Sequence, residues 1–222
     1  HEEKTLILCA IDEITLSLED SSLTLQSMSA SKHAASFKNI VQSWEYDLSH
    51  ISDVIDAWIG TQRRWMYLQS IFCGADDIRM QLPVEADKFD KIDLAWKRIM
   101  CSTQEDNDAK VLESCRVEGR LEHLNELSAQ LELCQKSLSQ YLNTKRDAFP
   151  RFFFISDDEL LSILGTSDAT LVQEHMLKLF DNCAKLLFGP NNESIIGLMS
   201  AEGESFELSE PVQVLGLPVE VW

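Results

Sequence analysis

Apolar residues recur at steps of three and four over residues 37–72, which is the spacing of one face of an α-helix. The positions are Phe37, Val41, Trp44, Leu48, Ile51, Ile55, Trp58, Trp65, Leu68 and Phe72, with the polar Gln62 in one slot. No proline and a single glycine, Gly60, interrupt the pattern. It predicts one helix of about 35 residues, roughly 50 Å long at 1.5 Å per residue. Helices of this length are typical of rods and bundles rather than of compact enzyme domains.

Further segments show the same helical period, and polar connections separate them. Apolar stripes run over residues 7–28, 89–100 and 121–142. Pro83 suits the first turn of a helix, where the missing backbone amide would have no partner anyway. The expected connections are the Ser-rich stretch 27–36, the break at Gly74 and the polar loop TQEDND at 103–108.

The stretch FPRFFFISDDELL at residues 149–161 joins a cluster of phenylalanines to a cluster of acids. Pro150 ends the preceding helix, and the apolar residues after it predict a buried extended segment. Ser156 and Glu159 have the spacing of a capping box, in which each side chain bonds the backbone N–H of the other residue. The acids therefore begin a helix, and the aromatic rings fix the angle at which it leaves. The residues of this expected structural joint are Phe149, Pro150, Phe152, Phe153, Phe154, Ser156 and Glu159.

The period of the pattern changes towards the C-terminal end. Helical spacing predicts a last helix over residues 168–187, and the alternation after it predicts a β-hairpin over residues 195–208. The turn of the hairpin contains Glu202, Gly203 and Glu204, which we interpret as a candidate docking tip for a basic partner. The predicted fold class is mostly α: an elongated helical-bundle rod with one small β-hairpin near the C-terminal end. We divide it into a long-helix bundle at residues 1–147 and a part with helices and the hairpin at residues 148–222.

The composition disfavours some classes of binding partner but does not indicate any chemical reaction. The 222 residues carry a formal net charge of −18, which disfavours nucleic acids and anionic membranes because both attract basic patches. The six cysteines contain no CxxC pair and mostly occupy apolar helical positions, as reduced thiols do. No apolar run reaches the roughly 18 residues that a membrane span needs. The chain begins without methionine, so we expect it to be a piece of a longer protein.

No motif in the sequence predicts resident chemistry. The glycine-rich phosphate-binding patterns GxxxxGK[ST] and GxGxxG are absent, so we expect no nucleotide site. Asp47 and His50 share a helix face, but the Glu-x-x-His partners that a metal site between helices needs are missing. We therefore predict no catalytic, cofactor-binding or metal-binding residue in this segment.

Several blocks of the sequence resemble, in their order, the linker region of dynein heavy chains. They are RRWMYLQSIF, LPVEADKF, IDLAWKRIM, LCQKSLSQYLNTKRDAFPRFFFISDDELLSIL and IIGLMSAEGESFEL, and the resemblance covers residues 14–222. The sequences LCQKSLSQYLNTKR and TLQSMSAS, the latter at residues 24–31, resemble those of axonemal chains, in particular the outer-arm gamma type.

The resemblance implies a mechanical lever that lies across the AAA+ ring of the same heavy chain. The lever would bend and straighten as the ring hydrolyses ATP, and so would drive microtubule-based movement of a cilium or flagellum. ATP and Mg would bind in the ring, so this segment would not be an enzyme although the parent chain would be a motor ATPase. The implied partners are the ring, the dynein intermediate and light chains, and microtubules. The implied location is the cytoplasm and cytoskeleton, in the axoneme of a cilium or flagellum.

Two other classes of protein remain as alternatives at this point. A passive spectrin-like scaffold or tethering module would also need long helices, and a helical-bundle enzyme is a second rival. If the segment is a lever, it needs joints, and hinges sit at the ends of secondary-structure elements. The candidate joints are the break at Gly74, the loop at 103–108 and the corner at 149–154.

Overall fold

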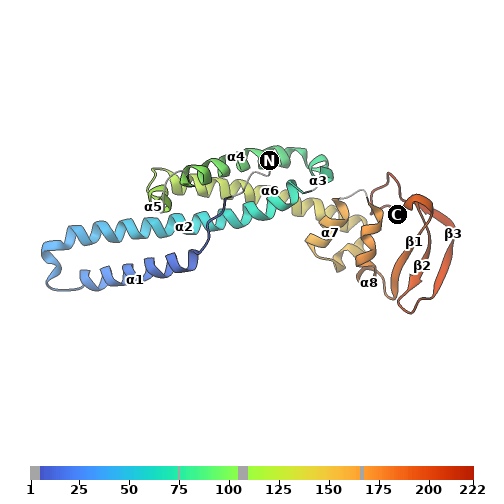
Figure 1. The fold of residues 1–222 in the computed structure, drawn as a ribbon, viewed down its shortest axis with the longest axis horizontal. Helices are drawn as coiled ribbons and strands as arrows, with labels where there is room; N and C mark the ends of the chain where they lie inside the picture. Colours follow the sequence, from blue (N-terminus) through green and yellow to red (C-terminus); the bar gives the residue numbers. More distant parts are fainter. Residues whose placement is uncertain (1–5, 75, 105–109, 166–167) are drawn as a thin grey trace. The chain divides into compact units, whose positions relative to one another are not determined.

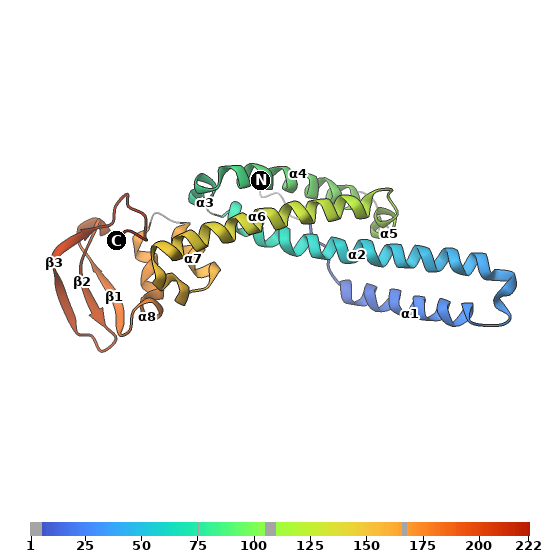
Figure 2. The same cartoon turned by 180° about the vertical axis from the view of Figure 1, so that it is seen from behind.

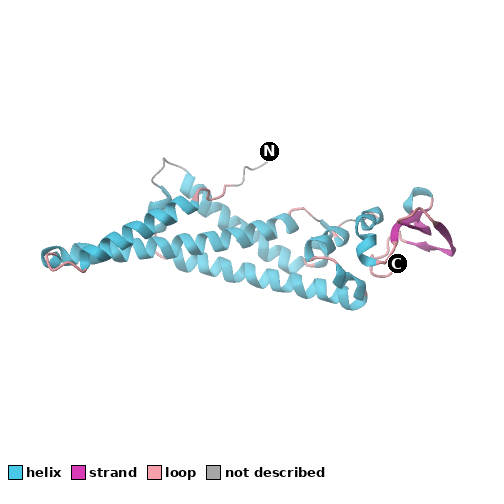
Figure 3. Cartoon of the chain, turned by 90° about the horizontal axis from the view of Figure 1, so that it is seen from below, coloured by secondary structure: helices cyan, strands magenta, loops and turns pink. Residues whose placement is uncertain are grey.

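The computed structural model describes residues 6–74, 76–104, 110–165 and 168–222 (Figure 1). The chain divides into two compact units, the first formed by His1–Leu68 with Lys88–Leu133 and the second by Gln69–Asp87 with Cys134–Trp222. Helices dominate, and a small antiparallel sheet lies near the C-terminal end of the sequence (Figure 3). This confirms the mostly α fold class that the hydrophobic pattern predicts.

The first unit is built from long helices that lie side by side. Its elements are α1 (Ile11–Ser29), the short 3-10 helix η1 (Ala34–Phe37), α2 (Lys38–Phe72), α4 (Pro83–Gln104), α5 (Lys110–Cys115) and α6 (Arg120–Ala148), of which α2, α4 and α6 also contribute residues to the second unit. Figures 1 and 2 show α4 and α6 beside α2. The 35 residues of α2 confirm the single long helix predicted from the unbroken apolar stripe.

Tryptophan rings form the centre of the first unit. Trp58 and Trp65 of α2 are fully buried, and Trp96 of α4 is 1% exposed. The rings of Trp65 and Trp96 stack with their centroids 5.5 Å apart. Trp65 Nε1 donates a hydrogen bond to Asp93 Oδ1 at 3.0 Å, so its polar atom is satisfied inside the core. The helices are thereby held together by close-packed aromatic side chains rather than by surface charges.

The N-terminal part of the same apolar stripe has a different environment. Phe37 is 61% exposed and Trp44 is 49% exposed, so this end of the apolar stripe is not buried. The nearby helix α1 contains no buried residue at all. A helical period identifies which face of a helix is apolar, but burial requires another element to cover that face.

Gln62 explains the polar slot in the stripe of α2. It is 7% exposed, and its side-chain amide forms two hydrogen bonds with the backbone of one residue, Leu8. Leu8 N donates to Gln62 Oε1 at 2.8 Å, and Gln62 Nε2 donates to Leu8 O at 3.1 Å. The buried amide therefore holds the extended segment that precedes α1 against the middle of α2.

The second unit combines short helices with the sheet. Besides the parts of α2, α4 and α6 named above, its elements are α3 (Asp76–Gln81), the 3-10 helix η2 (Pro150–Phe154), α7 (Asp157–Leu164), the 3-10 helix η3 (Ala169–His175), α8 (Met176–Leu179), β1 (Cys183–Phe188), the 3-10 helix η4 (Pro190–Asn192), β2 (Ser194–Ser200) and β3 (Ser205–Gln213). The strands pair antiparallel in the order β1-β2-β3. The predicted hairpin is confirmed as β2 and β3, with Leu198 opposite Phe206.

The helix predicted over residues 168–187 is wrong in its second half. Helical structure ends at Leu179, Asn182 adopts a positive φ of 53°, and Cys183–Phe188 forms β1 instead. Pairing of β1 with β2 supplies backbone hydrogen bonds that the local apolar pattern does not reveal. The result is a three-stranded sheet where a two-stranded hairpin was expected.

A side chain holds the outer edge of β1. Gln173 Nε2 donates to Leu186 O at 2.6 Å, and Leu186 N donates to Gln173 Oε1 at 2.8 Å. Both polar backbone groups of this edge-strand residue are therefore satisfied from η3, in the same way that Gln62 satisfies Leu8 in the first unit.

Candidate functional site at the corner and the sheet

The corner between α6 and α7 is a tight helical turn around one phenylalanine. Pro150–Phe154 forms a 3-10 helix, so the predicted extended conformation is wrong. Phe152 is 1% exposed and meets Phe149 edge to face at 4.9 Å, whereas Phe153 and Phe154 are 63% and 68% exposed. A 3-10 helix has about three residues per turn, so only one of three consecutive side chains can face inward. The predicted burial of these rings therefore holds for Phe152 and not for Phe153 or Phe154.

Arg146, in the last turn of α6, holds this corner from inside. Its Nε and Nη2 atoms donate to Phe152 O at 3.4 Å and to Ile155 O at 3.2 Å. Nη2 also lies 2.8 Å from Asp157 Oδ1 in the first turn of α7. Only 12% of the Arg146 side chain is exposed. One guanidinium, with its fixed fork of donors, therefore joins the end of α6, the turn and the start of α7.

A second arginine ties the corner to α8. Arg151 Nη1 donates to Leu179 O at 2.8 Å, and Leu179 is the last residue of α8, whose carbonyl has no partner within the helix. The guanidinium carbon of Arg151 lies 4.5 Å from the centre of the Phe180 ring, a cation–π contact. Neither arginine was among the predicted corner residues, and the only signal in the sequence was a basic residue close to a helix end.

The predicted capping box is present and links two helices. Glu159 N donates to Ser156 Oγ at 3.3 Å, and Ser156 N donates to Glu159 Oε2 at 2.9 Å. The other carboxylate oxygen, Oε1, pairs with Lys178 of α8 and lies 3.7 Å from His175 Nδ1. The hydrogen bond from Lys178, followed by that from the Ser156 amide, lowers the pKa of Glu159 to about 2. The cap that begins α7 is thus also the ion pair that attaches α8.

The acidic turn of the hairpin contacts the start of β1. Gly203 has a positive φ of 88°, which the tight turn requires, and its N–H donates to Ser200 O at 3.2 Å. Ala201 N donates to Asn182 Oδ1 at 3.4 Å. A hydrogen bond from the Asn182 side chain is the main cause of a lowered pKa of Glu202. Glu202 is therefore held locally, while Glu204 lies on the wall of the cavity described next.

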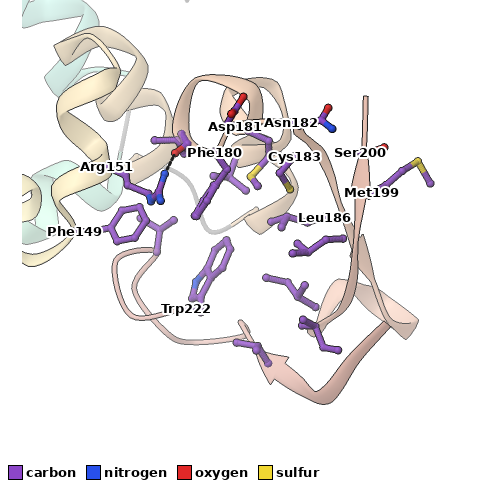
Figure 4. A pocket seen from close by; sticks show the side chains of 18 of the residues that line it. Phe149, Arg151, Phe180, Asp181, Asn182, Cys183, Leu186, Met199, Ser200 and Trp222 are labelled. Atoms are coloured by element: carbon purple, nitrogen blue, oxygen red, sulfur yellow. Dashed lines mark hydrogen bonds between the residues drawn. The ribbon is translucent and has the colours of Figure 1, made fainter. Parts of the chain in front are cut away.

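A cavity of about 1270 Å³ lies between the corner, α8, the sheet and the last residues of the chain. Figure 4 shows the rings of Phe149, Phe180 and Trp222 on one side of it and Leu186 on the strand side. The lining is mostly apolar, with Arg151 among the few charged residues. The walls of the cavity come from segments far apart in the chain, so no local pattern in the sequence predicts it.

The part of the chain that the structure describes offers no group of three His, Cys, Asp or Glu side chains placed to hold a metal ion. In the same residues, no helix combines the length and the apolar character needed to cross a membrane. Cys134, which sits in the apolar stripe of α6, is 1% exposed, so its thiol is a core group.

The sequence of the chain matches one family of known proteins over its whole length. All of residues 1–222 match the model of the dynein heavy chain, N-terminal region 2. The chain belongs to this family of dynein heavy chains, which confirms the resemblance seen in its sequence blocks.

Individual relatives support the same assignment. The chain is 55% identical over 221 residues to the dynein-1-alpha heavy chain of the flagellar inner arm I1 complex from Chlamydomonas reinhardtii. It is 51% identical over 224 residues to the dynein axonemal heavy chain 10 of Homo sapiens and 43% identical over 209 residues to the dynein axonemal heavy chain 1 of Mus musculus. The alignments cover 100%, 100% and 94% of this chain but 5% of each relative. The algal relative is named for an inner arm, so the likeness to outer-arm gamma chains stays a prediction.

Proposed function

We propose that this chain is a force-transmitting lever segment of an axonemal dynein heavy chain. The observation that carries the proposal is the aromatic core of the first unit, in which α2 and α4 share fully buried tryptophans. Bending such a core would open cavities between close-packed rings, which costs several kcal/mol per large side chain. An element that transmits force must resist bending, and this core supplies that resistance.

The corner at residues 149–159 is the proposed joint of the lever. Apart from Phe152, it is held by hydrogen bonds from Arg146 and Arg151 and by the Ser156–Glu159 cap. Such bonds can be exchanged for bonds to water at small net cost, whereas packed rings cannot. The break at Gly74 is a second proposed joint, because α2 ends at Phe72 and α3 begins at Asp76. The loop at 103–108 is the third proposed joint. Its first two residues, Thr103 and Gln104, belong to α4, and the rest of it lies outside the described residues.

Within the whole motor, the segment would act on partners that lie outside these residues. The relatives are named axonemal dynein heavy chains, so we place the protein in the axoneme of a cilium or flagellum. Its proposed partners are the AAA+ ring of the same chain, dynein intermediate and light chains, and microtubules. ATP and Mg would bind in the ring and not in this segment.

A flexible insertion in the complete heavy chain tests the lever. Placing Gly-Gly-Ser between Ala148 and Phe149 should uncouple the joint, so that microtubule gliding slows at least about twofold while ATPase activity persists. The control is the same insertion between Asn191 and Asn192, two exposed residues of a turn. Unchanged gliding by the corner variant, with intact folding by circular dichroism, would favour a passive scaffold instead.

The turn at residues 201–204 is the proposed docking tip of the lever. Glu202, Gly203 and Glu204 form an exposed acidic loop that suits a basic surface of another part of the motor. Glu202→Lys in the complete heavy chain should therefore change gliding velocity or its coupling to ATP hydrolysis. Equal velocities and equal coupling in wild type and variant would exclude docking through this charge.

A further inference from the structure

The turn between α1 and α2 is exposed throughout. It consists of the end of α1, the four-residue 3-10 helix η1 and the start of α2, and every side chain that the structure describes in residues 29–40 is exposed. Figures 1 and 2 show this turn at the far end of the α1–α2 pair, beyond α5. A 3-10 helix of one turn has poor hydrogen-bond geometry, and these side chains are already in water. Extending the turn therefore gives up little packing.

The same turn differs in charge from the rest of the chain. Residues 21–44 form the longest stretch without aspartate or glutamate in a chain whose net charge is −18, and they contain Lys32 and Lys38. The nearest acids along the chain, Asp20 and Glu45, lie roughly 10 Å or more from the turn at 1.5 Å per helical residue. That separation exceeds the Debye length of about 8 Å at physiological ionic strength. A protein that approaches the turn therefore meets a basic surface.

Ser36 stands between the two lysines of this turn. Lys32 precedes it by four residues, Phe37 follows it directly, and Lys38 comes next. Phe37 is 61% exposed, so its ring is accessible to a partner. Kinases that select basic substrates recognise the pattern of charge around the acceptor hydroxyl, with their own carboxylates facing the lysines or arginines of the substrate. They bind the substrate chain in an extended form, which this turn can adopt.

We propose that Ser36 is an acceptor site for a serine kinase of this basic-directed class. In the reaction, Ser36 Oγ attacks the γ-phosphorus of ATP, the bond from that phosphorus to the β,γ-bridging oxygen breaks, and ADP leaves. The hydroxyl proton passes to the catalytic aspartate of the kinase. The kinase binds the ATP, so the reaction requires no phosphate-binding loop in the chain that is modified. This proposal does not depend on the lever function.

Phosphorylation would remove the basic character of the turn. A phosphoserine carries about −1.5 to −2 charges at pH 7, which offsets the two lysine charges beside it. Phe37, Ile40 and Trp44 are exposed at steps of three and four, which places them on one face next to Ser36. Whatever meets this apolar row would find a basic turn beside it before the modification and a neutral or acidic turn afterwards.

Two other exposed serines show which features single out Ser36. Ser31 lies in the same turn, but its Oγ already accepts a hydrogen bond from His33 N at 3.3 Å. Ser205 is also followed by an exposed phenylalanine, but Glu207 stands where Ser36 has a lysine. Ser205 also belongs to β3 and is paired with β2, so its backbone is not free to enter a kinase groove.

Mass spectrometry of the complete heavy chain tests the site after treatment with ATP and a calcium- and lipid-dependent serine kinase, which selects basic residues on both sides of the acceptor. Trypsin cuts after Lys32 and Lys38, and the peptide between them, HAASFK, has Ser36 as its single hydroxyl group. This peptide should gain one phosphate. Ser205 is the matched control and should stay unmodified in the same sample. Ser36→Ala, at an exposed residue, should leave the peptide without phosphate.

The contribution of charge has its own test. Lys38→Glu makes the two residues after Ser36 the same as those after Ser205, and it should slow phosphorylation of Ser36 at least about tenfold. Lys136→Glu, at an exposed residue of α6, makes the same change of charge far along the chain and should leave the rate unchanged. Fragmentation spectra locate the phosphate in both variants.

Three results would overturn the proposal. An unmodified HAASFK peptide would show that the turn is no substrate, and phosphate on Ser205 at the same rate would show that the lysines and the open turn are not what the kinase selects. Equal rates for Lys38→Glu and Lys136→Glu would refute recognition through the basic residues of the turn.

Discussion

The tryptophan core of the first unit and the corner of the second are held by different forces. Trp65 and Trp96 stack on one another, and Trp58 is fully buried with its Nε1 3.3 Å from Met100 Sδ. The corner has one buried ring, Phe152, and otherwise relies on Arg146 and a cap. Packing of large rings involves no titrating group and no charge for salt to screen, whereas charged hydrogen bonds respond to pH and to ionic strength. The two regions should therefore respond differently to substitution, pH and salt.

The strongest test of the comparison removes a ring from the core of the first unit. Trp65→Ala should lower the free energy of unfolding by about 4–5 kcal/mol, because it leaves a large cavity under Trp96. Trp44→Ala, at a residue that is 49% exposed in the same helix, should change it by about 0.5 kcal/mol or less. Urea midpoints measure both values. Similar losses for the two variants would mean that the core is not the stiff part.

The next largest effect is expected at the centre of the corner. Phe152→Ala should cost about 3 kcal/mol, less than the tryptophan because Phe152 borders a cavity into which neighbours can relax. Phe153→Ala and Phe154→Ala should each cost about 0.5 kcal/mol or less, since both rings are exposed. Urea titrations measure the loss of unfolding free energy in each variant. Equal losses in all three would contradict the prediction that Phe152 alone is central to the corner.

A smaller effect is expected when the guanidinium fork at the corner is replaced. Arg146→Lys keeps the charge but loses most of the bonds to Phe152 O, Ile155 O and Asp157, which should cost about 1–2 kcal/mol. Arg116→Lys is the control, because Arg116 forms an exposed ion pair with Asp47 at 3.5 Å and should lose about 0.5 kcal/mol or less. Chemical denaturation at low salt measures the unfolding free energy of both variants. Equal losses would show that Arg146 contributes no more than an exposed ion pair.

The smallest effect concerns the pH dependence of the cap. Its bonds lower the pKa of Glu159 from 4.5 to about 2, so the ionised carboxylate stabilises the folded state at and above pH 4.5. This contribution is lost as the pH falls from 4.5 through about 2, because the unfolded state then binds the proton more readily. Glu159→Gln lacks the titrating group, so its urea midpoint should approach that of the wild type over this range. A gap between the two midpoints that stays constant with pH would refute the linkage.

Features set by neighbouring residues could be predicted from the sequence. The apolar stripe of α2 continues through its whole length without proline, and the Ser156–Glu159 box depends on residues three positions apart. The hairpin turn is local in the same sense, because Gly203 supplies the positive φ that the turn needs. In each case the interactions that determine the structure lie within the element itself.

Features that depend on distant segments could not be predicted. Cys183–Phe188 has a helical apolar spacing, but pairing with β2 makes it a strand. Trp44 has core spacing but is 49% exposed. The cavity was invisible for the same reason, since its walls join Phe149, Leu198 and Trp222. Tertiary contacts determine the structure and burial of these residues. The periodicity of a single sequence carries no information about such contacts.

The hydrogen bonds of Gln173 to Leu186 affect how the sheet can meet other chains. An open strand edge is a template on which a foreign strand can add, and the amide of Gln173 occupies that template on β1. The other edge of the sheet is β3, where Pro211 removes one of the backbone donors. In a crowded axoneme, where neighbouring dynein heavy chains would meet, one glutamine thus protects this sheet against pairing edge to edge.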